Sequence, residues 1–119
     1  MRALKLVLFI VMVGFFAGLI ESCGKKCESD PPQARVKNNG TTKASVQIKT
    51  SDGNTVNINN VDPGTSSPYA SYAAGSIEFT ITVNNTATVK AVPMSNCYNY
   101  DIAIDANNTI TTTAFDRNK

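Results

Sequence analysis

A strict alternation of apolar and polar side chains is the feature that most limits how this chain can fold. Residues 75–84, GSIEFTITVN, carry an apolar side chain at every second position, and residues 98–105, YNYDIAID, repeat the pattern. Successive side chains of an extended strand point to opposite faces, so this period of two indicates strands with one buried and one solvated face. No segment has the period of 3.6 that marks an amphipathic helix.

Turn residues divide the chain into strands of similar length. Asp52-Gly53 suits a tight hairpin, and asparagines at 84–85 and 107–108 tolerate the left-handed conformation that such turns need. We therefore predict seven strands, at about 34–38, 43–50, 54–61, 75–84, 86–92, 98–105 and 108–115. Strands that recur about every ten residues, each with one polar face, predict an all-β fold, a seven-stranded antiparallel sandwich of two sheets.

The apolar positions of these strands define the expected core. It would contain Val36, Val46, Ile48, Val56, Ile58, Ile77, Phe79, Ile81, Val83, Val89, Ile102, Ile104 and Ile110, with tyrosines at its ends. A core this thin favours an additional covalent constraint on the domain. The threonines at 109 and 111–113 fit a strand because they are β-branched. The alternative is a ladder of hydroxyls that faces a ligand.

The first 22 residues have the composition of a lipoprotein signal peptide. Two basic residues within 1–5 precede an uncharged apolar run at 6–20, which is shorter than the roughly 20 residues that span a bilayer. The sequence LIESC at 19–23 resembles a bacterial lipobox, with an aliphatic residue at −3 and a small one at −1. This resemblance implies cleavage before Cys23 and its lipidation with acyl chains such as palmitate. A retained N-terminal anchor helix is the alternative.

Two cysteines remain once Cys23 is lipidated. Cys27 and Cys97 are an even pair in the oxidising compartment that an exported chain enters, and we predict a disulfide between them. The bond would close a loop of 71 residues, worth roughly 4 kcal/mol of stability in the loop-entropy model. Two unpaired thiols are the alternative. The predicted organisation is a signal peptide at 1–22, a polar tether at 23–33 and a β-sandwich domain at 34–119.

The composition favours neither catalysis nor nucleic-acid binding. The chain has no histidine, the commonest general base and metal ligand near neutral pH, and no G-x-S-x-G motif, so we expect no enzyme activity and no cofactor. Without residues 1–22 it keeps nine basic and eight acidic residues, a balance that predicts no nucleic-acid partner. Asp52, Asp101 and Asp105 lie near turns without the spacing of a calcium loop, which is typical of solvated aspartates.

The longest segment without a strand pattern is residues 62–75, and long loops in compact domains are often functional. It contains Tyr69 and Tyr72, which together with the loop around Asn96 form a candidate binding site for a glycan or a peptide. The alternative is that both tyrosines cap one end of the sandwich, with the ring buried and the hydroxyl in water.

Several of these segments together resemble a known family. The sequence ARVKN at 34–38, the Asp52-Gly53 hairpin, and SPY at 67–69 followed by Gly75 resemble an uncharacterised family of bacterial secreted and lipoprotein domains. The resemblance covers about residues 34–115 and implies an immunoglobulin-like sandwich. The short lysine-containing linker after Cys23 also looks like lipoproteins of the Bacteroidetes type.

These observations lead to one expectation about function. The chain should be an exported lipoprotein of the cell envelope, attached to the outer membrane through its lipid and displayed on the periplasmic side or on the surface. A structural or protein-interaction role is expected, with an envelope protein as the partner. The alternative is a surface lipoprotein that binds a glycan or a peptide.

Overall fold

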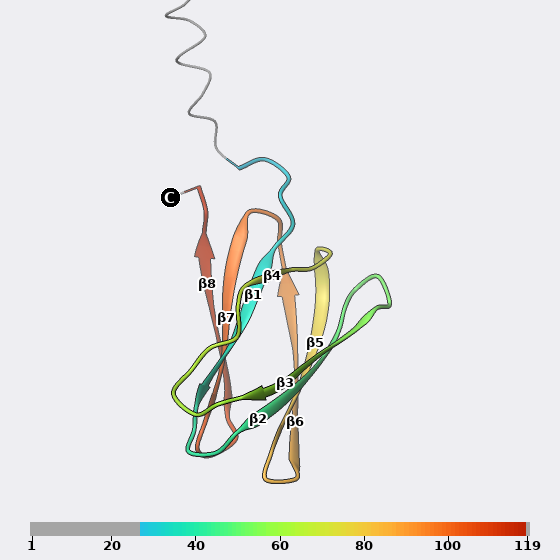
Figure 1. Ribbon diagram of the computed structural model, residues 1–119. Coiled ribbons are helices and arrows are strands. Elements are labelled where there is room, and N and C mark those ends of the chain that lie inside the picture. The colour runs from blue at the N-terminus through green and yellow to red at the C-terminus, as the bar shows by residue number, and fades with distance from the viewer. Residues whose placement is uncertain (1–26, 119) are drawn as a thin grey trace, which may run out of the picture.

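The structure, a computed structural model, describes residues 27–118, and this part of the chain is all-β (Figure 1). It contains eight strands: β1 (Gln33–Asn39), β2 (Ala44–Lys49), β3 (Thr55–Val61), β4 (Ala70–Ser71), β5 (Gly75–Val83), β6 (Thr86–Met94), β7 (Tyr98–Asp105) and β8 (Ile110–Asp116). Seven of them lie where the sequence predicts strands. The additional strand, β4, has only two residues and lies within the long segment 62–75.

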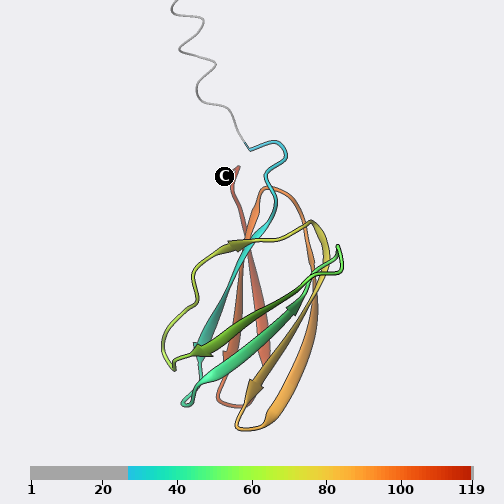
Figure 2. The same ribbon diagram turned by 45° about the vertical axis from the view of Figure 1, so that its right-hand side comes forward.

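The strands form two four-stranded sheets, ordered β4-β1-β7-β8 and β3-β2-β5-β6. Figures 1 and 2 show the two sheets as separate layers. Neighbouring strands are antiparallel except β1 and β7, which are parallel along seven residue pairs from Gln33–Asn99 to Asn39–Asp105. The expectation of a purely antiparallel arrangement is therefore wrong at this pair. Between β1 and β7 the chain builds the whole second sheet, and this long crossover lets β7 return in the direction of β1.

Alternation places one face of each sheet in a shared core. The largest fully buried apolar side chains come from both sheets: Val36, Ile48, Ile77, Phe79, Ile81, Ile102 and Ile104. In β5 the burial alternates without a break from Ile77 to Val83, as the sequence predicts. The polar side chains between them point away from the core, so each sheet also has an outer face.

The predicted core is wrong at two positions, both on edge strands. Val89 of β6 is 57% exposed because the register pairs it with Thr80, which lies on the outer face of β5. Val56 of β3 is 37% exposed although its partner Ile48 is fully buried. Ile58 and Ile110 are only partly buried against the core. Tyr72 and Tyr100 are buried with this core. Residues that the sequence pattern did not assign to the core are also buried: Ala34, Ala44, Val61, Val92, Met94 and Cys97.

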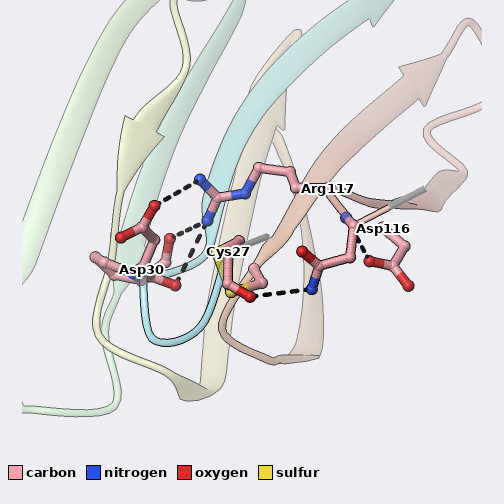
Figure 3. The surroundings of a disulfide bond; sticks show 7 residues. Cys27, Asp30, Asp116 and Arg117 are labelled. Atoms are coloured by element: carbon pink, nitrogen blue, oxygen red, sulfur yellow. Dashed lines mark hydrogen bonds and ion pairs between the residues drawn. A yellow bond between two sulfur atoms is a disulfide. The ribbon is translucent and has the colours of Figure 1, made fainter. Parts of the chain in front are cut away.

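The predicted disulfide is confirmed. Cys27 and Cys97 are bonded, with their Cα atoms 5.7 Å apart. Figure 3 shows that the C-terminal residues surround this bond: the Nη2 of Arg117 donates to the carbonyl of Pro31 at 2.8 Å, and the Nδ2 of Asn118 donates to the carbonyl of Cys27 at 3.2 Å. The first described residues are thus held against the sheets.

The residues predicted as a tether extend into this fixed region. Backbone bonds join Asp30 to Cys97 and Pro32 to Tyr72, and Pro32 is fully buried. The signal peptide and Cys23 lie outside the described residues. Within residues 27–118 no helix is long and apolar enough to cross a membrane.

The long segment 62–75 lies along the edge of β1 and does not project from the sheet. The N–H of Gly64 donates to the carbonyl of Asn38 at 2.7 Å, and the N–H of Ser67 donates to the carbonyl of Val36 at 2.9 Å. In return the N–H of Val36 donates to the hydroxyl of Ser67 at 2.9 Å. Together with β4, this segment gives β1 a hydrogen-bonded neighbour on the side opposite β7.

Candidate interaction surface

The outer face of β1, β7 and β8 presents a regular array of side chains. Because β1 pairs with β7 and β7 pairs with β8 in fixed registers, the outward residues form rows across the three strands. Starting from the end near the disulfide, the rows are Gln33–Asn99–Phe115, Arg35–Asp101–Thr113, Lys37–Ala103–Thr111 and Asn39–Asp105–Thr109. We call this array the outer face; most of its members are polar, and Phe115 is a large apolar side chain that is 48% exposed.

Asp101 lies near the middle of the outer face and is 7% exposed. Two nitrogens of Arg35 donate to its two carboxylate oxygens, at 2.8 and 3.2 Å. The hydroxyl of Tyr69, from the segment along the β1 edge, donates to Asp101 at 2.7 Å. The Nζ of Lys37 lies 4.0 Å from the same carboxylate. The guanidinium of Arg35 also lies over the ring of Tyr69, 4.7 Å from its centroid, which is the geometry of a cation–π contact.

These contacts set the ionisation of the cluster. Burial by itself would raise the pKa of Asp101, but the hydrogen bonds from Arg35 and Tyr69 outweigh it and hold this pKa below its usual value. The pKa of Tyr69 is raised, first by burial and then by its bond to the Asp101 carboxylate. The pKa of Arg35 is raised mainly by the same carboxylate. At neutral pH the cluster is therefore a charged, hydrogen-bonded clamp between β1, β7 and the segment at 62–71.

Next to this clamp the outer face is hollowed, with a cavity volume of ≈380 Å³. The small side chain of Ala103 lies between Lys37 and Thr111 in its row, so the floor is low there. Lys37, Asn39, Asp101, Asp105, Phe115 and the threonines at 109, 111 and 113 complete the lining. The hollow thus offers hydroxyl, amide, carboxylate and ammonium groups beside one aromatic ring. These groups suit hydrogen bonding to a polar partner.

The structure separates the residues that the sequence suggested as a ligand site. Tyr69 belongs to the clamp, whereas Tyr72 is 6% exposed and part of the core, where burial raises its pKa. Asn96 is exposed in the turn between β6 and β7, next to Cys97 of the disulfide. The ring of Tyr72 therefore has no face open to a ligand.

The aspartates considered for calcium are engaged with protein groups. Both oxygens of Asp101 accept from Arg35. The Oδ1 of Asp105 accepts from the backbone N–H groups of Asn107 and Thr109, each at 2.9 Å, which closes the β7–β8 turn. Asp52 accepts from Thr50, and this bond lowers its pKa. In residues 27–118 no group of three or more His, Cys, Asp or Glu side chains could hold a metal ion.

Sequence reasoning did not bring Arg35, Asp101 and Phe115 together as a site. The alternation of apolar and polar residues predicts that these side chains point outward. It does not predict which strands lie side by side, and so which outward side chains meet. Their neighbours follow only from the parallel β1–β7 pairing. No protein-family model matches this chain, and no curated protein matches it.

Proposed function

We propose that the protein is an exported bacterial lipoprotein, anchored in the outer membrane through lipid on Cys23, with an immunoglobulin-like sandwich that serves as a protein-interaction module. The lipobox-like sequence at 19–23 supports the anchor. The Cys27–Cys97 disulfide supports an oxidising compartment. If Cys23 is the lipidated residue, only three residues separate it from Cys27, so the sheets would be held close to the bilayer.

The observation that carries the interaction role is the outer face. It combines the hollow, the exposed ring of Phe115 and a charge cluster around the buried Asp101. Exposed aromatic side chains beside fixed polar groups are common at the centres of protein interfaces.

The interaction role is tested by purification of the intact lipoprotein from membranes under mild detergent. We expect a stoichiometric envelope protein to accompany it, and Phe115→Ala to reduce its recovery. Val89→Ala is the matched control, because Val89 is also exposed and lies on the other sheet. Recovery of the lipoprotein with no stoichiometric partner would contradict this role.

A second candidate function, binding of a glycan or a peptide, is favoured by the polar lining of the hollow. Its threonine hydroxyls, the amide of Asn39 and the ring of Phe115 match the groups that recognise a sugar. A glycan array probed with the soluble domain tests it: Phe115→Ala should abolish any signal, whereas Val89→Ala should leave it unchanged. A signal that survives Phe115→Ala would exclude the outer face as the glycan site.

A further inference from the structure

Three of the four sheet edges carry features that discourage pairing with another strand. β4 has two residues, and Pro68 precedes it closely. β6 contains Lys90 and Pro93. In β3 two residues, Asn59 and Asn60, oppose the single Ser45 of β2, and Asn60 has a φ of 60°. Short strands, lysine, proline and bulges are the devices by which natural sheets protect their edges.

The fourth edge, β8, has none of these features. It is seven residues long, ITTTAFD, pairs with β7 without a register shift, and carries a single charge at its last residue, Asp116. Within residues 27–118 no strand pairs with its other side. A long, regular edge of this kind is a template for another strand.

The register shows which backbone groups of β8 are available. The N–H of Asp105 donates to the carbonyl of Thr109, and the N–H of Arg117 donates to the carbonyl of Cys97. In an antiparallel pair the bonded positions alternate, so Thr111, Thr113 and Phe115 direct their backbone groups toward β7. The residues between them, Ile110, Thr112, Ala114 and Asp116, direct their N–H and C=O groups away from the sheet.

We propose that this edge of β8 binds an extended segment of another envelope protein, which adds a fifth strand to the sheet. Donors and acceptors that alternate along a strand are matched by a polypeptide backbone and not by a glycan, so the occupant is a peptide segment. The added strand would lie beside Thr111, Thr113 and Phe115, and we expect β-branched or aromatic residues opposite them. The proposal deepens the interaction role above and rests on it.

The anchor geometry favours another protein over a second copy of this chain. A two-fold dimer through this edge would make the two β8 strands antiparallel. β8 ends beside Cys27, to which Asn118 is bonded, so the two Cys27 residues would lie at opposite ends of a strand about 24 Å long. A tether of residues 23–26 spans at most about 14 Å. If the strands stand upright on the bilayer, the tether of only one of the two copies would reach it.

Site-specific photocrosslinking in living cells tests this proposal. The intact lipoprotein would carry p-benzoylphenylalanine in place of Phe115, and a control would carry it in place of Val89. Each would be combined with Thr112→Pro, which removes an outward N–H without removing a bond to β7, or with Thr112→Val, which keeps that N–H. The melting temperature of each purified variant reports whether it folds, and Ala114→Pro serves as a second proline variant.

The expected result is a cross-link from position 115 to one other protein and none from position 89. Thr112→Pro and Ala114→Pro should each reduce the yield of this cross-link at least about tenfold, because a hydrogen bond to the added strand is lost and the proline ring blocks its approach. Thr112→Val should change the yield by less than about twofold. No cross-link, a cross-link to a second copy, or a cross-link that folded proline variants leave intact would overturn the proposal. Lipidation of Cys23 is measured separately by intact mass. A protein without lipid on Cys23 is therefore distinguished from one that binds no strand at β8.

Discussion

At the scale of single residues, Asp101 connects parts of the sequence that lie far apart. It is 66 positions from Arg35 and 32 from Tyr69, yet it bonds to both. Arg35 lies on β1, Asp101 on β7 and Tyr69 just before β4, so these three side chains fix the segment 62–71 to the sheet. Asp101 is buried and accepts from charged and polar donors through both oxygens. An amide in its place keeps only one acceptor oxygen, so at least one donor loses its acceptor and faces an N–H group.

Asp101→Asn should lower the free energy of unfolding at pH 7 by about 2 kcal/mol. The pKa of Asp101 is lowered in the folded state, so its contribution is complete above the unfolded value near 3.8 and is lost as the pH falls through the folded value. Urea unfolding between pH 2 and pH 7 checks this. The wild-type protein should lose more stability below about pH 4 than the variant, and equal losses in both would contradict the assignment.

Tyr69→Phe isolates the hydroxyl in the same cluster. It removes the bond to Asp101 but keeps the ring beneath Arg35, so the expected loss is smaller, about 1 kcal/mol. Denaturant unfolding measures the loss. Phenolic titration of the wild-type protein should show raised pKa values for Tyr69 and Tyr72, and only that of Tyr72 should remain in the variant. A loss as large as that of Asp101→Asn would mean that the ring, not the hydroxyl, has changed position.

At the scale of elements, the two faces of one strand differ in their contribution to stability. β6 has Val92 buried at 4% exposure and Val89 exposed at 57%. Both residues are valine, so residue type does not explain the difference. Val92 pairs with the buried Ile77 of β5, whereas Val89 pairs with Thr80 on the outer face.

Val92→Ala should therefore lower the free energy of unfolding by about 2 kcal/mol, because buried methyl groups are lost and a cavity remains. Val89→Ala should change it by less than about 0.5 kcal/mol. Denaturant unfolding of the two purified variants under one set of conditions makes the comparison. Equal losses would mean that the register of β5 and β6 is not the one described.

The disulfide acts between elements, since it joins the first described residues to the start of β7. Cys27→Ser with Cys97→Ser should destabilise the domain by about 4 kcal/mol. The backbone bond from the N–H of Arg117 to the carbonyl of Cys97 should weaken with it. Thermal unfolding measures the first effect, and amide exchange of Arg117 measures the second. Unchanged protection of Arg117 would show that the C-terminal contacts hold without the covalent bond.

At the scale of the whole molecule, alternation in the sequence predicts the strands and most of the core, because a period of two decides which side chains face inward. It does not decide strand direction or neighbours, so the parallel β1–β7 pair and the clamp around Asp101 were not predicted. β4 was missed because two residues carry no period. The disulfide was predictable because only two cysteines remain in the chain after Cys23. The ligand site expected at Tyr69, Tyr72 and Asn96 required that the ring of Tyr72 be exposed. That ring is buried by tertiary contacts, which a sequence pattern does not show.

The proposed function requires that lipid on Cys23 holds the β-domain close to a membrane and that the Cys27–Cys97 bond closes the domain on itself. The most direct test is the intact mass of the protein extracted from membranes, with and without reduction. We expect a chain that begins at Cys23, carries diacylglycerol and a further acyl chain, and gains two mass units on reduction, about the mass of two hydrogens added to one disulfide. A water-soluble chain that begins at another residue, or one with no mass change on reduction, would contradict it.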